Sequence, residues 1–317
     1  MEKYGIYQVT VPLPFRLNHV HCYLTRQDKG WSIIDTGLNR AETRKAWEEA
    51  FAIHNINPQE DIEKIILTHY HPDHLGFSGE LEEWTKAPVW ISSKGEFMAR
   101  NVWQSSSYER NYQFFRVHGL PQQLIEQMSD YDKQFRSFIR PPGRFETIVE
   151  GQQLQIGELT YEAILTGGHA EGHICFYNQE EKVFLGGDHL LRKITPNISY
   201  YGYGEENPLQ VYIDSLKRLQ ALDILIVIPG HGPIFRDAGE RILEILQHHE
   251  DRLESVLEHV VKERTAYQVC RSLFNRELTL HEQRFAIGET LAHLNYLVVR
   301  GEISKEMSTK GEIYFSK

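Results

Sequence analysis

A short segment in the first quarter of the chain concentrates side chains that bind metals. Within six positions it carries three histidines and one aspartate: His69, His71, Asp73 and His74. The segment follows Ile65–Leu67, an apolar run that predicts a buried strand. Imidazole suits zinc and other transition ions, and a carboxylate adds negative charge. Four such side chains on one loop can serve two adjacent ions; the alternative is a chance cluster in a histidine-rich chain.

Three later loops each follow an apolar strand and present one more candidate ligand. These ligands are His169 after Ala163–Leu165, Asp188 after Val183–Leu185, and His231 after Ile224–Ile228. Glycines precede or flank each one, which lets the backbone turn sharply and approach a site closely. One such loop would be weak support for a metal site, but three in order behind the first cluster strengthen it.

The chain carries four features in a fixed order: the motif H-x-H-x-D-H, a glycine-rich loop with a histidine, an aspartate after a strand, and a final Gly-His. This pattern resembles that of the metallo-β-lactamase fold superfamily. The resemblance covers Tyr4 to about Phe235. It implies an α/β fold, an αββα sandwich with the metals at one edge between two sheets. The remaining C-terminal segment resembles the winged-helix appendage of one lactamase-related branch, so the likeness extends over nearly the whole chain.

The resemblance also implies a role for each of the seven candidate ligands. It assigns a first metal to His69, His71 and His169, and a second metal to Asp73, His74 and His231. It assigns Asp188 to a bridge between the two metals. The alternative, that His71 and His74 are buried structural histidines, would require partners for all of their ring nitrogens. We therefore favour the ligand roles.

Departures from the superfamily pattern limit what can be said of the substrate. Flavin-partnered di-iron members depart from H-x-H-x-D-H in the first cluster, so they do not match, whereas single-iron sulfur dioxygenases remain an alternative. Around His169 the common hydrolase loop T-P-G-H-T-P-G-H is altered, because Gly167 and Glu171 replace prolines and Ala170 replaces threonine. These replacements leave the stiffness of the loop and the substrate preference open, but the candidate ligand His169 is retained.

Several further residues are candidates for supporting the site. Asp35 matches a superfamily position that supports the metal ligands from a strand end, although a plain turn-capping role is an equal alternative. We interpret His173 as orienting the ligand loop and His189 as structural. Packing is favoured over substrate contact for one pair, His19 and His21. The cluster Tyr200, Tyr201 and Tyr203 either lends a hydroxyl to the substrate or packs as a loop. Solvated helix faces are predicted for the others, such as His54, His118, His248, His249 and His259.

Composition restricts the class of protein. The chain has 317 residues, 41% hydrophobic and 25% charged, with a net charge of −10, which is ordinary for a globular protein. Nucleic-acid binding generally needs a basic face, so the acidic balance argues against it. The three scattered cysteines indicate neither bridges nor ligands. No membrane-spanning run is present, and we expect a cytoplasmic protein whose oligomeric state the sequence leaves open.

Two regions interrupt the alternation of strands and helices. Lys94–Arg140 predicts a helical insertion whose aromatic side chains mostly pack on the core, although some could line a substrate pocket. From Ala238 onward three helices and a terminal hairpin are expected, which is a winged-helix order. This part holds 11 Lys and Arg against 13 Asp and Glu, so we favour a packing or partner module over a DNA reader. The expected domains are a catalytic domain, 1–237, and a winged-helix-like domain, 238–317.

The function that we predict is metal-dependent hydrolysis by a hydroxide that bridges two divalent ions. The expected substrate is a small ester or thioester. Asp73 is the candidate catalytic residue, because a ligand carboxylate with a free oxygen can orient the hydroxide and pass a proton to the leaving group. Zinc is favoured, with manganese or iron as alternatives. A single-strand nuclease or phosphodiesterase, a mononuclear-iron sulfur dioxygenase and a metal-dependent DNA-binding regulator remain open.

Overall fold

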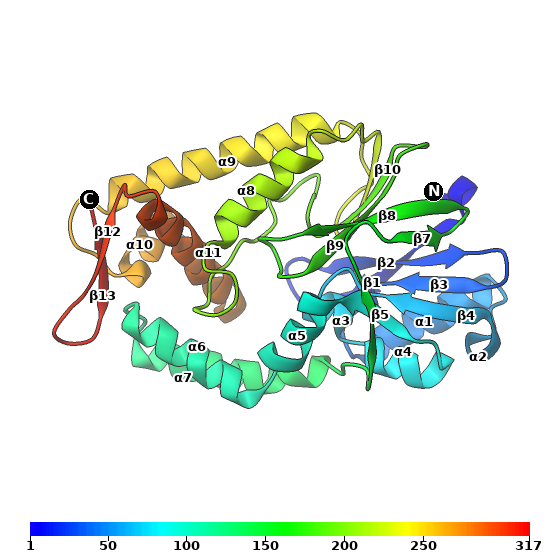
Figure 1. The fold of residues 1–317 in the computed structure, drawn as a ribbon. Coiled ribbons are helices and arrows are strands. Elements are labelled where there is room, and N and C mark those ends of the chain that lie inside the picture. The colour runs from blue at the N-terminus through cyan, green and yellow to red at the C-terminus, as the bar shows by residue number, and fades with distance from the viewer.

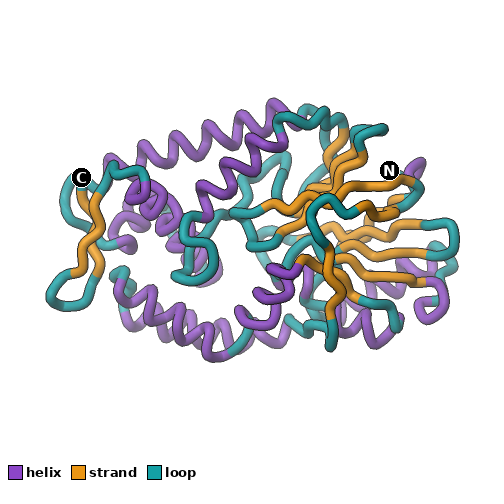
Figure 2. The backbone as a smooth tube through the Cα atoms, viewed as in Figure 1, coloured by secondary structure: helices purple, strands orange, loops and turns teal.

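The computed structural model describes residues 1–317 and contains two facing β-sheets with helices on both outer sides (Figure 1). The first sheet has six strands in the order β1-β2-β3-β4-β5-β6, and the second has five in the order β11-β10-β9-β8-β7. This is the αββα arrangement of the metallo-β-lactamase fold, as expected from the sequence. Figure 2 shows how the loops gather at the end of the sheets that faces the C-terminal helices.

The strands of the first sheet are β1 Ile6–Pro12, β2 His19–Arg26, β3 Trp31–Ile34, β4 Ile62–Ile66, β5 Val89–Ser92 and β6 Phe145–Ile148. Those of the second are β7 Gln153–Ile156, β8 Leu159–Thr166, β9 His173–Asn178, β10 Val183–Gly187 and β11 Ile226–Pro229. Strands β3 to β6 are parallel, as are β10 and β11. Strand β9 is buried along its whole length, since it lies inside a sheet covered on both faces.

Helices α1 Ala41–Ile53, α2 Pro58–Asp61, α3 Pro72–Leu75 and α4 Ser78–Thr85 belong to the first half of the chain, and α8 Pro208–Leu219 lies between β10 and β11 of the second sheet. Apolar side chains form two layers around the first sheet. One lies under the helices, where Trp47 and Leu81 are buried. The other lies between the sheets, where Ile34 and Ile66 meet Phe176 and Leu185. Burial on both faces fixes the two sheets against each other.

The predicted helical insertion lies between β5 and β6. It consists of α5 Ser93–Val102, α6 Ser105–Val117, α7 Gln122–Phe135 and the short 3₁₀ helix Arg136–Phe138. Most of its aromatic side chains pack, as expected: Phe115 is buried, for example. In Figure 1, α6 and α7 run along the lower side of the molecule toward the C-terminal helices.

The C-terminal segment forms α9 Ala238–His259, α10 Ala266–Leu273, α11 Leu280–Val299 and the hairpin β12 Ser304–Met307 with β13 Ile313–Ser316. Capping boxes at Thr265 and Thr279 define where α10 and α11 begin. A single apolar cluster joins α11 to α6, α7, α8 and α9 through residues such as Leu291 and Ile125. The segment is therefore packed against the rest of the chain. No helix combines the length and apolar content needed to cross a bilayer.

Candidate metal centre

The loop after β4 presents four of the candidate ligands in a compact form. His71 is the residue before α3, and Pro72 occupies its first turn, where a missing N–H costs nothing. Within α3 the helical turn places Asp73 and His74 side by side. The loop is also tied to the neighbouring strand, because the backbone N–H of Leu67 donates to Trp90. The ligands therefore stand on a short, well-anchored turn.

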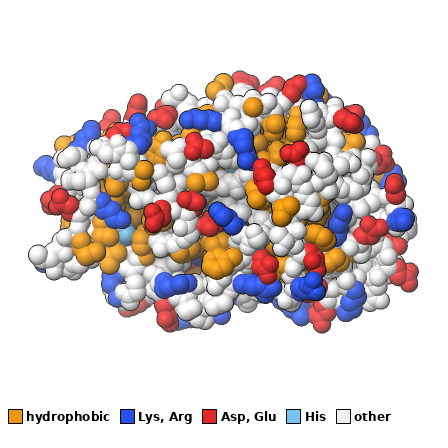
Figure 3. Space-filling model, in the orientation of Figure 1, with side chains coloured by type: hydrophobic (Ala, Val, Ile, Leu, Met, Phe, Trp, Pro, Cys, Tyr) orange, Lys and Arg blue, Asp and Glu red, His pale blue; other side chains and the backbone are white.

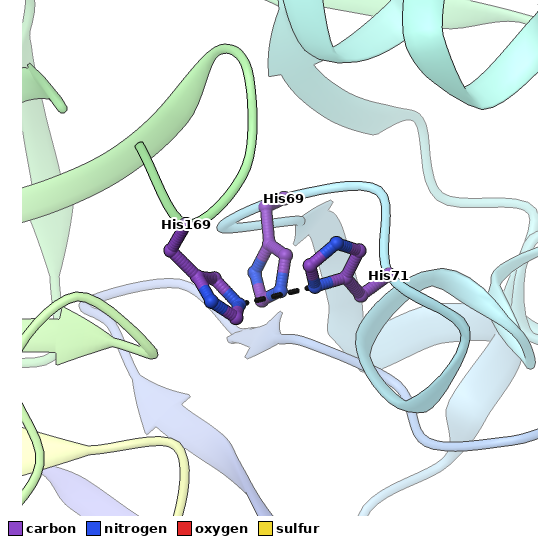
Figure 4. Close-up of side chains that lie close together, drawn as sticks. All are labelled: His69, His71 and His169. Atoms are coloured by element: carbon purple, nitrogen blue, oxygen red, sulfur yellow. Dashed lines mark hydrogen bonds between the residues drawn. The ribbon is translucent and has the colours of Figure 1, made fainter. Parts of the chain in front are cut away.

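Three histidines from two loops converge in a first cluster (Figure 4). His69 and His71 come from the β4 loop and His169 from the loop between β8 and β9, and their ligand nitrogens lie within 4.8 Å of one another. His71 Nδ1 and His169 Nε2 lie 3.0 Å apart. Three converging imidazoles are a donor set that suits zinc and similar ions.

A second cluster lies beside the first and contains Asp73, His74, Asp188 and His231. Asp188 Oδ2 lies 3.3 Å from His74 Nε2 and 3.2 Å from His231 Nε2. The same oxygen lies 3.7 Å from His169 Nε2 in the first cluster. Asp188 thus stands between the two groups, which is where the sequence predicted a bridging carboxylate.

Unpaired buried atoms provide a test of whether cations fit here. His69 Nε2, His74 Nε2 and Asp188 Oδ1 are buried and have no hydrogen-bond partner. A buried polar atom without a partner costs free energy. All three belong to the two clusters, and each is an atom that can donate a lone pair to a metal. The donor set therefore fits divalent cations at both positions.

Hydrogen bonds hold most of the ligand rings in a defined tautomer. His74 Nδ1 donates to Asp35 Oδ2 at 2.8 Å, His169 Nδ1 to the Asn197 carbonyl at 3.0 Å, and His231 Nδ1 to the His19 carbonyl at 2.7 Å. Each ring therefore directs Nε2 toward its cluster. Such partners orient metal ligands and increase their basicity.

Asp35 is the most extensively connected of these partners. Besides His74, it accepts hydrogen bonds from the backbone N–H and the hydroxyl of Thr68, both at 2.8 Å. The Thr68 hydroxyl in turn lies 2.9 Å from His69 Nδ1. Of the two roles left open by the sequence, the structure favours support of the candidate ligands His74 and His69.

The electrostatics differ between the two clusters. Burial lowers the pKa values of His69 and His169 and lowers that of His71 to about 3, so these rings are neutral, as metal ligands must be. In the second cluster burial also opposes protonation, but Asp188 and other carboxylates outweigh it. They raise the pKa of His231 to about 10 and that of His74 well above its ordinary value. A cation at this position would replace those protons.

Glycine is required where the last ligand loop approaches the site. A Cβ atom at Gly230 would collide with Asp188 Oδ1 and would lie 2.9 Å from His74 Cε1. At Gly168, φ is +92° and a Cβ would overlap Tyr212. Both glycines stand directly before a candidate ligand, so the close approach noted in the sequence has a steric cause.

The structure brings all seven predicted ligands together, and it also places the supporting residues. His173 Nε2 accepts the backbone N–H of Asp188 at 3.2 Å, in agreement with a loop-orienting role. His189 is buried against Ser215 at 3.0 Å, in agreement with a structural role. The prediction of solvated faces is wrong for His118 and His249, which are 1% and 2% exposed. His249 of α9 meets His293 of α11, and His118, at the end of α6, stacks on Phe315 of β13; a local pattern does not reveal such distant contacts.

A cavity of about 400 Å³ opens onto the clusters. Candidate ligands line one part of its wall: His71, Asp73, His169, Asp188 and His231. Much of the remaining wall is apolar and includes Leu13, Phe15, Leu17, Leu38, Met98, Val102, Trp103, Phe135, Ile194 and Phe285. Trp103 and Phe135 are the aromatic residues of the insertion that reach this pocket. Tyr201 and Tyr203 line it as well, whereas Tyr200 does not.

Among the pocket residues that the sequence analysis missed are four from the C-terminal segment. They lie in the first two turns of α11: His281, Glu282, Arg284 and Phe285. No motif or spacing links this helix to the loops that carry the candidate ligands, so the sequence contains no signal for its place in the pocket.

Comparison with known proteins places this arrangement in a family. Residues 16–231 match the metallo-beta-lactamase superfamily, and residues 253–317 match the metallo-beta-lactamase-like C-terminal domain. The chain belongs to the metallo-beta-lactamase superfamily. It is a metallo-hydrolase with a His/Asp cluster able to bind metal.

Similar proteins span nearly the whole chain. The probable metallo-hydrolase YqjP of Bacillus subtilis is 32% identical, over 94% of this chain and 93% of the relative. The crystal structure of the metallo-beta-lactamase family protein TTHA1429 from Thermus thermophilus is 33% identical, with a TM-score of 0.87 over 99% of both chains. A beta-lactamase domain protein from Burkholderia ambifaria is 29% identical, with a TM-score of 0.88 over 99% of this chain and 92% of the other.

Proposed function

We propose that this chain is a dinuclear metallo-hydrolase that cleaves a small ester or thioester with an apolar part. The observation that carries this proposal is the pair of ligand clusters that meet at Asp188 and open into an apolar pocket of about 400 Å³. Function in this fold depends on the pocket rather than on the topology, so the pocket lining defines the substrate class.

We infer that His69, His71 and His169 hold one cation and that Asp73, His74 and His231 hold the other, with Asp188 shared. Zinc is the proposed metal, because imidazole and carboxylate donors suit it. Divalent cations held by these residues would supply Lewis acidity and lower the pKa of water at the site.

Asp73 is the residue that we propose to move the proton. Its side chain is 22% exposed and lines the pocket, whereas that of Asp188 is 9% exposed. His74 and His231 outweigh the effect of burial and hold the pKa of Asp73 well below its usual range, so the carboxylate is ionised at neutral pH. Its oxygens can accept a hydrogen bond from the nucleophile and orient it, and a proton received from the nucleophile would be held weakly and passed on to the leaving group.

The pocket wall supports an ester or thioester over a nucleic acid. Its apolar residues, among them Phe15, Trp103 and Phe135, suit an acyl chain. Basic and acidic side chains are interspersed on the face shown in Figure 3, and the net charge is −10. A long polyanion would meet no extended basic surface on that face.

Metal analysis combined with a substrate panel tests the proposal. We expect about two ions per chain in the wild type and fewer in the His71→Ala and Asp188→Asn variants. We also expect hydrolysis of acyl thioesters that both substitutions abolish. Full metal content in the double variant would contradict the ligand assignment. Activity on single-stranded RNA alone, or oxygen consumption with a persulfide and one iron per chain, would contradict the substrate class.

A further inference from the structure

Helix α11 closes one side of the pocket through contacts with the loop between β1 and β2. The His281 ring stacks on Phe15, with centroids 4.5 Å apart and planes 8° from parallel. Glu282 pairs with Arg16 at 3.1 Å. The wall formed by α11 is therefore fixed in place, and the side chains that it directs into the pocket are available to contact a substrate.

Arg284 is the buried cation of this wall. Its side chain is 14% exposed, and Nη1 donates to Asp132 Oδ1 on α7 at 2.7 Å. Asp132 also accepts the Tyr112 hydroxyl at 2.8 Å. The other lining arginine, Arg16, is 80% exposed. Arg284 is thus held rigidly inside the pocket, where a guanidinium is far more effective than at the exposed rim.

The surroundings of Arg284 are rich in hydrogen-bond donors. Its guanidinium carbon lies 5.7 Å from the ring centre of Tyr108 and 5.9 Å from that of Tyr201. Burial raises the pKa of Tyr108 to about 12 and also raises that of Tyr201, so both hydroxyls stay protonated. Tyr201, Tyr203 and Ser199 line the same pocket. Asp132 accepts a hydrogen bond from only one nitrogen of the Arg284 guanidinium, Nη1. The other N–H groups of this guanidinium can therefore donate to a further acceptor.

We propose that Arg284 binds a carboxylate on the substrate, so that the preferred ester or thioester carries a negative charge on its acyl part. The proposal rests on the hydrolase function above and adds the substrate class. A planar guanidinium matches a carboxylate with two parallel hydrogen bonds, and the neighbouring hydroxyls supply more donors. The apolar residues that line the same pocket would accommodate the methylene groups of such a substrate.

A matched pair of thioesters tests this specificity. N-acetylcysteamine thioesters of pentanoate and glutarate have acyl chains of the same length and differ in the terminal carboxylate. We expect wild type to prefer the glutaryl thioester by about 10-fold or more in kcat/KM, since a charge-assisted hydrogen bond is worth that much. The Arg284→Gln, Asp132→Asn double variant leaves no buried charge unpaired, and its preference should fall by about 10- to 100-fold.

A second ion pair on the same helix provides the control. Arg252 and Glu289 join α9 to α11 at 3.3 Å, with side chains 22% and 21% exposed, outside the pocket. The Arg252→Gln, Glu289→Gln double variant should keep the glutaryl preference. Two results would overturn the proposal: an equal loss of kcat/KM on both thioesters in the Arg284→Gln, Asp132→Asn variant, or no preference for the glutaryl thioester in wild type. Arg284 would then serve only to hold α11 against α7.

A binding measurement separates failure of this proposal from failure of the hydrolase function. Glutaramate, an amide with one terminal carboxylate, should raise the Tm of metal-free wild type more than pentanamide, which has the same chain length and no carboxylate. This difference should disappear in the Arg284→Gln, Asp132→Asn variant. If wild type hydrolyses neither thioester but shows the glutaramate effect, the ester and thioester assignment fails and the anion site stands. If glutaramate and pentanamide shift Tm equally, the anion site is contradicted.

Discussion

At the scale of single residues, the candidate metal centre depends on side chains that orient the ligands. Asp35 accepts hydrogen bonds from His74 and twice from Thr68, all at 2.8 Å. It adopts φ of +57°, a conformation that aspartate and asparagine tolerate better than most residues. The strained backbone therefore serves to aim a carboxylate at a buried ring.

Replacing Asp35 by asparagine should weaken metal binding without removing a proposed ligand. The backbone conformation is retained, but the amide is uncharged and cannot accept from His74 and Thr68 as the carboxylate does. We expect metal affinity to fall by about 10- to 100-fold, measured by competition with a chromogenic chelator. Asp130→Asn, at an exposed position paired with Lys133, is the matched control. Unchanged affinity in the Asp35 variant would show that the carboxylate only caps the turn.

At the scale of elements, the packing of α9 on α11 contains a buried pair of histidines. His249 Nδ1 lies 3.1 Å from His293 Nε2, and His293 Nδ1 donates to the Glu289 carbonyl at 2.8 Å. His293 Nε2 must then accept, so His249 donates from Nδ1. Burial lowers the pKa of His249 to about 2 and that of His293 to about 4. Both rings are neutral in the folded protein.

Low pH should therefore destabilise the packing of α9 on α11. The unfolded chain takes up protons near the ordinary histidine pKa of 6.5, whereas the folded chain does not. The stability present above pH 6.5 is lost as pH falls toward 4. We expect the free energy of unfolding to drop by about 1 kcal/mol or more from pH 7 to pH 5. Denaturant titrations at several pH values measure this.

The double variant His249→Gln, His293→Gln should show a shallower pH dependence, because neither amide titrates. His259→Gln, at the end of the same helix α9, serves as the control and should keep the wild-type slope. A slope that is the same in all three proteins would mean that this pair does not contribute to acid sensitivity.

At the scale of the whole molecule, the candidate ligands connect the two sheets. His69, His71, Asp73 and His74 follow a strand of the first sheet, whereas His169, Asp188 and His231 follow strands of the second. Helix α11 then adds a wall from the C-terminal segment. The proposed centre is thus assembled only when three separate parts of the chain pack together.

Metal removal should lower the stability of the whole fold. Ions that bind only the folded state stabilise it by mass action, by about 2.7 kcal/mol at a free concentration 100 times Kd. We expect treatment with a chelator to lower Tm and added zinc to restore it, as measured by calorimetry. In the Asp188→Asn variant the same treatment should change Tm less. An identical Tm with and without metal would count against ligands that join the two sheets.

The sequence by itself determined the types and the order of the candidate ligands, because each follows a buried strand and carries a local signal of glycine and histidine. It also indicated the helical insertion through its composition and the C-terminal helices through their apolar periodicity. Only the tertiary structure decided that Arg284 and His281 enter the pocket and that His249 is buried. These outcomes depend on contacts such as Arg284 with Asp132, between segments far apart along the chain. Local patterns record which face of a helix is apolar, but not which distant element covers it.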